Sequence, residues 1–248
     1  MSANLTFEKV SVHFQILRHD DYNLKATLVN ILRKKNRQRQ IVTALDHVSL
    51  SLHVGDRLGL VGANGSGKTT LLRVAAGVLP PTLGKVKLIP KTLNLLGDAG
   101  LGLNPEISGR ENLRELALIQ GLSWSIVNKK LPQMEEDTGL GERILDPMYT
   151  YSAGMHARVR LAVMCQLEPE LIVLDEGIGQ ADREFTQRSE GHIQKMIERT
   201  PVVVIASHDE GLLKRYCTKF AFLQDGHVKA VDTFDRIQYL YHQSVPMR

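Results

Sequence analysis

The chain has 248 residues, 43% of them hydrophobic, so it can bury one large α/β core with a subdomain but has no room for a second full domain. Its formal net charge of +4 is mildly basic and fits a nucleotide, a nucleic acid or a membrane surface without choosing among them. Residues 1–5 lack a signal-peptide pattern and no stretch reaches about 18 apolar residues, so we expect a cytoplasmic chain that does not itself span a membrane.

Alternating apolar and polar residues predict two antiparallel strands near the N-terminus, over 5–14 and 48–54. Between them, residues 20–35 carry leucine and isoleucine at helical spacing and lead into a basic cluster at 33–39. This pattern predicts an inserted amphipathic helix that ends in cations. Its role stays open between a solvated surface helix and a contact with anionic lipid or a membrane partner.

Residues 62–69 match the pattern G-x-x-x-x-G-K-[ST] in full and lie between an apolar strand at 58–61 and a helix. In such a loop, glycines let backbone N–H groups converge on phosphate oxygens, and the next helix turns its positive end toward the same anion. Lys68 would reach the β- and γ-phosphates, and the Thr69 hydroxyl would ligate Mg²⁺. The predicted nucleotide-binding residues are Gly62, Asn64, Gly65, Ser66, Gly67, Lys68, Thr69 and Thr70.

The middle of the chain is predicted to be helical. Short strands are expected within 84–96, and a helix that begins at Ser108 follows them. A second helix is expected after Gly154. This block interrupts the α/β pattern, and we interpret residues 98–166 as an inserted helical subdomain.

Two apolar runs, 171–174 and 202–206, predict strands buried on both faces of a parallel sheet. Asp175 and Glu176 follow the first run, where a strand ends beside the P-loop in such a sheet. Asp175 is placed to hold Mg²⁺, directly or through water, and Glu176 to orient and polarise the attacking water. Isolated Cys165 and Cys217 lack metal or redox spacing and predict two buried side chains in a reducing compartment.

The order P-loop, Tyr-Ser-Ala-Gly-Met at 151–155, Asp-Glu at 175–176 and Ser-His-Asp at 207–209 resembles the ATP-binding cassette (ABC) ATPases over nearly the whole chain. The resemblance implies an α/β P-loop NTPase fold of the ABC type, with a mostly parallel core sheet, an antiparallel β subdomain and an inserted helical subdomain. One ABC ATPase domain would span 1–248, with its α/β core at 1–97 and 167–248.

The resemblance also implies further site residues. Ser152 and Gly154 of one protomer would contact the γ-phosphate held by the P-loop of the other, so that ATP joins a head-to-tail homodimer. A serine hydroxyl and free N–H groups at a helix N-terminus suit that anion. His208 matches a histidine that contacts the γ-phosphate, and Asp182 lies in a loop that crosses the dimer interface. Phe14 matches the aromatic residue that stacks on adenine, although a core role for Phe14 and a stacking role for His13 stay open.

Residues 96–112, the signature at 151–155 and the inserted helix look like the ATPases of polysaccharide exporters, which serve O-antigen, capsule and teichoic-acid transport. This narrower resemblance implies an ATP- and Mg²⁺-dependent homodimer on the cytoplasmic face of the membrane, beneath two copies of a permease. Lipid-linked polysaccharide would be handled indirectly, and no nucleic acid is expected. Asp98 stands where most ABC proteins have a glutamine that joins Mg²⁺, so it is a candidate ligand.

The chain stops soon after an Asp225-Gly226 turn, so we expect the short kind of exporter ATPase, without a carbohydrate-binding domain. Three alternatives remain. They are an ABC ATPase for another transported substrate, a soluble ABC ATPase that acts on nucleic acid or ribosomes, and a regulatory subunit that clamps nucleotide without turnover.

Overall fold

The computed structural model describes residues 5–16, 40–87, 92–96, 103–175 and 194–244. The predicted amphipathic helix over 20–35 and its basic cluster lie outside the described residues. Within the described part of the chain, no helix is long and apolar enough to cross a membrane.

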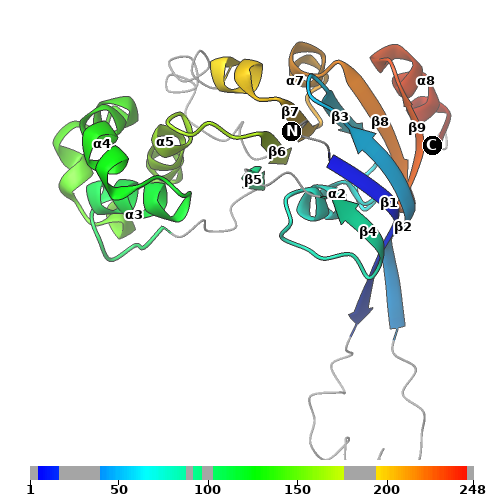
Figure 1. Ribbon diagram of the computed structural model, residues 1–248, viewed down its shortest axis with the longest axis horizontal. Coiled ribbons are helices and arrows are strands. Elements are labelled where there is room, and N and C mark those ends of the chain that lie inside the picture. The colour runs from blue at the N-terminus through cyan, green and yellow to red at the C-terminus, as the bar shows by residue number, and fades with distance from the viewer. Residues whose placement is uncertain (1–4, 17–39, 88–91, 97–102, 176–193, 245–248) are drawn as a thin grey trace, which may run out of the picture.

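A six-stranded sheet forms the centre of the molecule (Figure 1). In spatial order its strands are β5 (Thr92–Leu96), β6 (Leu171–Asp175), β7 (Val202–Ala206), β3 (Arg57–Val61), β8 (Lys219–Gln224) and β9 (His227–Asp232). Neighbouring strands run parallel except β8 and β9, which pair antiparallel. The predicted mostly parallel core sheet is therefore confirmed.

Strands β6 and β7 are buried on both faces, as their apolar runs predict. On β7, Val204 belongs to the core cluster on one face of the sheet, whereas Val203 and Ile205 belong to the cluster on the other. Successive side chains of a strand point to opposite faces, so a strand covered on both sides needs an unbroken apolar run.

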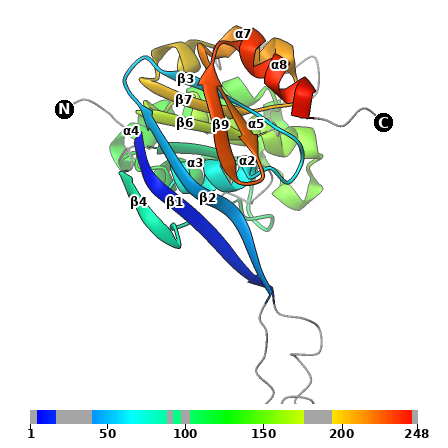
Figure 2. The same cartoon turned by 90° about the vertical axis from the view of Figure 1, so that its right-hand side faces the viewer.

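A second, three-stranded antiparallel sheet has the order β2 (Gln40–Leu52), β1 (Leu5–Ile16) and β4 (Leu83–Lys87). Figure 2 shows β1 and β2 as a long ribbon whose far end extends beyond the body of the protein. The predicted antiparallel subdomain is confirmed, but the prediction of a strand at 48–54 is wrong in its bounds. Val54 lies in an exposed turn, and the strand begins at residue 40.

Irregular pairing and the exposure of the start of β2 explain this difference. The register of β1 and β2 shifts at several points, and Lys9 and His47 adopt positive φ angles of 49° and 50°. These irregularities fall within residues 43–50 of β2, where they interrupt the alternation of buried and exposed side chains. Ile41 and Val42 pair regularly with β1 but are both exposed, so the start of β2 lacks the period-two pattern that marks a strand in sequence.

The helices fall into two groups (Figure 1). Helix α2 (Lys68–Ala75) packs on one face of the core sheet, and α7 (Glu210–Tyr216) and α8 (Phe234–Ser244) pack on the other. Helices α3 (Gly109–Ile119), α4 (Trp124–Thr138) and α5 (Ala153–Met164) lie together at one side of the molecule. The last three share an apolar cluster of their own, which fits the predicted helical subdomain.

Side-chain caps define where these three helices begin. Ser108 Oγ accepts a hydrogen bond from the Glu111 N–H, and the Glu111 carboxylate accepts one from the Ser108 N–H, which completes a capping box. Ser123 and Ser152 cap α4 and α5 in the same way, each accepting from an N–H three residues later. The predicted starts of α3 and α5 are confirmed, and α4 is an additional helix that the sequence analysis did not single out.

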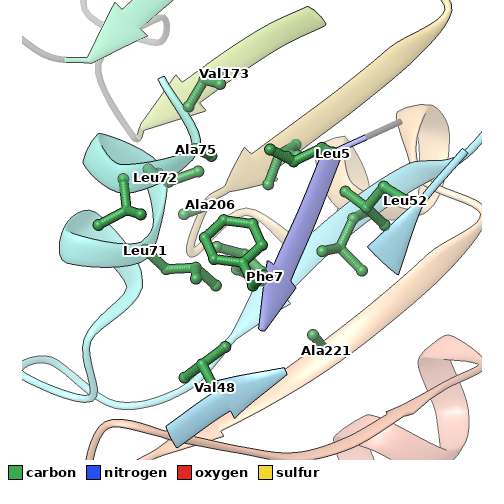
Figure 3. Packing of buried hydrophobic residues seen from close by; sticks show 14 of the residues in the cluster. Leu5, Phe7, Val48, Leu52, Leu71, Leu72, Ala75, Val173, Ala206 and Ala221 are labelled. Carbon is green, nitrogen blue, oxygen red and sulfur yellow. The ribbon is translucent and has the colours of Figure 1, made fainter. Parts of the chain in front are cut away.

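The main core lies between the antiparallel sheet, the core sheet and α2 (Figure 3). Leu5 and Phe7 of β1 and Leu71 and Leu72 of α2 belong to it, and each is at most 2% exposed. Burying a side chain of this size stabilises the fold by about 1.5–3 kcal/mol. The helix that follows the P-loop is thus fixed to two sheets at once.

Candidate nucleotide-binding site

The P-loop connects β3, whose middle residues are buried, to α2, and the space around the loop is so tight that two of its glycines are required. A Cβ atom on Gly62 would collide with the Leu223 carbonyl of β8 and lie 2.6 Å from Ser66 Oγ. Gly67 caps α2 with a φ angle of 108°, and a Cβ there would lie 2.7 Å from the Ala44 carbonyl of β2. The loop is therefore held between β8 and β2.

Lys68 lies against the loop that precedes it. Its side chain is 7% exposed, and Nζ donates hydrogen bonds to the Gly62 carbonyl at 2.7 Å and the Ala63 carbonyl at 3.1 Å. The Leu71 N–H donates to the Gly67 carbonyl at 2.9 Å, so the first turn of α2 closes on the helix cap. The N–H groups of the first turn, which includes Thr69 and Thr70, suit a phosphate group, because helix N-termini favour anions.

Thr69 and Asp175 meet although they lie far apart in sequence. The Thr69 hydroxyl donates to Asp175 Oδ2 at 2.8 Å, because β6 ends beside the first turn of α2. Hydroxyl and carboxylate oxygens are the ligands that Mg²⁺ prefers in proteins. This oxygen pair fits the predicted magnesium site.

His208 is also brought to the P-loop. It follows β7, and its Nε2 lies 3.0 Å from Asn64 Oδ1, in hydrogen-bond contact. Both side chains are exposed. His208 follows β7 and the P-loop follows β3, so both lie at the same edge of the parallel sheet, as their positions after strands predict.

A brace behind the P-loop was not found from the sequence. The Gly226 N–H donates to the Ser66 carbonyl at 3.0 Å, and the Asp46 N–H donates to the Gly226 carbonyl at 2.9 Å. The Asp46 carboxylate contacts His47 Nδ1 at 2.5 Å and His227 Nε2 at 3.3 Å. Hydrogen bonding from His47 lowers the pKa of Asp46 below its ordinary value of 3.8, so this carboxylate is ionised near neutral pH.

Phe14 lies on β1 opposite Val42 and is 40% exposed, which argues against the alternative of a core residue. Neighbouring His13 places its Nδ1 3.1 Å from Thr43 Oγ1. Adenine stacking on Phe14 stays a prediction.

The signature residues lie apart from the P-loop. Ser152 caps α5, where its Oγ accepts from the Met155 N–H at 3.3 Å and its carbonyl accepts from the His156 N–H at 3.0 Å. Its side chain is exposed, and Gly154 follows in the first turn. Figure 1 shows α5 within the helical group and α2 beside the sheets. Three further predicted residues, Asp98, Glu176 and Asp182, lie outside the described residues.

The two cysteines offer no reactive thiol. Cys217 is buried and Cys165 half-buried, both are free, and burial raises the pKa of each thiol to about 12. A thiol with such a pKa is almost entirely protonated near neutral pH and is a poor nucleophile and metal ligand. The prediction of a buried side chain is confirmed for Cys217, whereas Cys165 is only half-buried.

Comparison with known proteins decides the family. The profile of the ABC transporter family matches residues 45–179, more than half of the chain. The chain is an ABC transporter ATP-binding protein. This ABC protein is accordingly an ATPase subunit that binds and hydrolyses ATP, and the fold predicted for that family is the one observed.

Relatives of this ABC protein include exporter subunits. It is 33% identical to the O-antigen export system ATP-binding protein RfbE of Yersinia enterocolitica, over 90% of this chain and 95% of the relative. It is 30% identical to the teichoic acids export ATP-binding protein TagH of Staphylococcus haemolyticus, over 98% of this chain and 89% of the relative. Its fold matches a dimeric ATP-binding cassette in a post-hydrolysis state, bound to ADP and Pi, with a TM-score of 0.66 and 20% identity over 92% of this chain and 98% of the other.

Proposed function

We propose that this ABC protein powers the export of a lipid-linked polysaccharide through a separate membrane permease. Its similarity to RfbE and TagH, which extends over nearly the full length of both chains, carries this proposal. The two relatives serve different glycopolymers, so we commit to the class of cargo that they share. Two copies of the ATPase would act with two copies of the permease at the cytoplasmic face of the membrane.

The P-loop half of the site binds the triphosphate in this proposal. Backbone N–H groups of 62–69 and of the first turn of α2 hold the phosphate oxygens. Lys68, already directed at the loop by its contacts with the Gly62 and Ala63 carbonyls, interacts with the β- and γ-phosphates. Phe14 stacks on adenine, which contributes on the order of 1–3 kcal/mol and lowers the ATP concentration required.

Thr69 and Asp175 would hold Mg²⁺, with Asp98 as a further candidate ligand. When bound, the metal neutralises charge on the β- and γ-phosphate oxygens. Glu176 orients and polarises the attacking water, and His208 contacts the γ-phosphate from its position beside Asn64.

The second half of the site comes from another copy of the chain. Ser152 and the N–H groups around Gly154 would meet the γ-phosphate on the partner's P-loop, and Asp182 would cross the interface. The fold match to a cassette that is dimeric with ADP and Pi supports this arrangement, as does the placement of Ser152 on a unit separate from α2. ATP then closes the dimer because the closed form binds it more tightly than the open form.

The cargo is tested in the host that encodes the chain. A strain that carries only Lys68→Ala should lose polysaccharide from its surface and accumulate the lipid-linked polymer inside the membrane, since assembly continues while export stops. Lys229→Ala, a change of an exposed lysine on β9, is the matched control and should leave export intact. Normal surface polysaccharide in the Lys68→Ala strain, with purified wild-type protein still hydrolysing ATP, would assign the ATPase to another cargo.

A further inference from the structure

The residue before Ser152 is fixed in a buried position although Ser152 itself is exposed. Tyr151 is 8% exposed, and its hydroxyl donates to the Arg143 carbonyl at 2.6 Å. Burial raises the pKa of this phenol, so it stays protonated and able to donate. The backbone entering α5 is thus held at the position directly preceding the cap.

Gly109, the first residue of α3, leaves the space that the Tyr151 side chain occupies. A Cβ atom at position 109 would lie 2.5 Å from Tyr151 Oη and 2.8 Å from Ile144 Cδ1. Its backbone has no positive φ angle, so a larger residue is excluded by this contact and not by backbone conformation. The aromatic residue and the glycine fit each other across two helix starts.

The surrounding backbone reinforces this contact. The Met148 N–H donates to the Ile107 carbonyl at 3.0 Å, and the Tyr149 N–H donates to the Pro105 carbonyl at 2.9 Å. The Gly109 N–H adds a third hydrogen bond between the same two segments, to the Asp146 carbonyl at 3.3 Å. Residues 105–109 and 146–149 therefore form one hydrogen-bonded ribbon that leads directly to Ser152.

Asn112 fixes the other side of this ribbon. It is fully buried, and its side-chain N–H groups are within hydrogen-bond distance of the Asn104, Ile107 and Ser108 carbonyls, at 2.9, 3.3 and 3.0 Å. Its Oδ1 accepts from the Asn104 N–H at 2.7 Å. A buried amide with partners on both ends is costly to move, so the ribbon has a rigid support in α3.

We propose that Tyr151 and Gly109 are positioning residues that aim Ser152 and the first turn of α5 at the partner's nucleotide before it binds. This inference rests on the proposed cross-protomer site. A serine cap held in place loses less conformational entropy on contact with the γ-phosphate than a mobile one, so less ATP is needed to close the dimer. Neither residue touches the nucleotide; both act through the backbone of Ser152.

The test compares two tyrosines that differ by two positions. Tyr151→Phe should raise the ATP concentration for half-maximal dimerisation about threefold to tenfold, as expected for the loss of one hydrogen bond. Tyr149→Phe is the matched control, because Tyr149 is 66% exposed, and should change that concentration less than about twofold. Dimerisation would be followed by analytical ultracentrifugation in a non-hydrolysable ATP analogue, with nucleotide affinity measured separately on dilute monomer.

Gly109→Ala should act in the same direction and more strongly, because its methyl group displaces the Tyr151 side chain. Single-chain nucleotide affinity should stay at the wild-type value in every variant, since the P-loop is untouched. A general loss of stability would weaken dimerisation and single-chain nucleotide binding together and would contradict a positioning role. Unchanged dimerisation in Tyr151→Phe would contradict it as well.

Ser152→Ala, measured in parallel, separates this inference from the proposed function. If Ser152→Ala weakens dimerisation while Tyr151→Phe and Gly109→Ala do not, the positioning role alone is wrong. If Ser152→Ala leaves dimerisation unchanged, the cross-protomer site is wrong and the inference falls with it.

Discussion

The P-loop and the Ser152 cap are both loops at helix N-termini, but they are built in opposite ways. The P-loop is enclosed by β2, β8 and the turn at Gly226, and its lysine is 7% exposed. Ser152 is exposed, and its own hydrogen bonds lie within α5. The P-loop is surrounded by elements of its own chain. The backbone before Ser152 is held by buried contacts, but the Ser152 side chain faces solvent. An open, supported anion site is what a half-site for another molecule requires.

The difference predicts that damage to the P-loop removes nucleotide binding itself, whereas damage at Ser152 removes only closure. Substitutions placed in the two regions should separate these steps.

Gly62→Ala should destabilise the protein by about 1–3 kcal/mol and strongly weaken nucleotide binding, because the new methyl group has no space beside β8. Gly65→Ala is the matched comparison: nothing lies within 4 Å of a Cβ there, but its φ of 81° imposes about 1–2 kcal/mol of backbone strain. Urea unfolding and nucleotide titration would be measured on both. If Gly62→Ala binds nucleotide as tightly as the wild type, the P-loop is not confined by β8 and the contrast with the Ser152 cap is wrong.

Asp46→Asn should have a smaller effect, with nucleotide binding weaker by less than about fivefold, because exposed side-chain contacts of a carboxylate contribute little. The backbone bonds through Gly226 remain, and only the carboxylate contacts to His47 and His227 are lost. Asp225→Asn changes an exposed carboxylate in the turn that contains Gly226 and is the control. Equal effects of the two changes would show that the Asp46 carboxylate does not brace the loop.

The Asp46 carboxylate should make the stability of the protein depend on pH, and its lowered pKa gives the sign of that dependence. The stabilising contribution is present above the ordinary pKa of 3.8 and is lost as the pH falls through the lowered value in the folded protein. The stability difference between wild type and Asp46→Asn should therefore persist down to about pH 4 and shrink below it. Urea unfolding midpoints across this range would measure it.

Sequence patterns located the parts of the site that depend on local order. A P-loop pattern after a strand and a carboxylate after a buried apolar run place Thr69 and Asp175 at one sheet edge, and the structure joins them at 2.8 Å. Ser152 was identifiable as a helix cap because serine at that position satisfies an unpaired N–H group.

The contacts that support the P-loop and the Ser152 cap could not be predicted in the same way. Gly226 braces Ser66, and the Tyr151 side chain occupies the space above Gly109, through contacts between residues distant in sequence. Neither contact has a periodicity or a spacing. Gly109 reads in sequence as an ordinary first residue of a helix, and only the packing of Tyr151 shows why a side chain is excluded there. The start of β2 was missed for another reason: Ile41 and Val42 pair with β1 but are both exposed, so this part of the strand has no alternation of buried and exposed residues.

A mixed dimer tests the central claim most directly. Lys68→Ala would be mixed with Ser152→Ala, and the ATP retained per dimer measured after rapid gel filtration, with Glu176→Gln in both chains to prevent turnover. If each site combines the P-loop of one copy with Ser152 of the other, the mixed dimer contains one fully intact site. The mixture should then retain ATP that neither variant retains alone. If the mixture retains no more ATP than the two variants separately, each site is built within one chain and the account is contradicted.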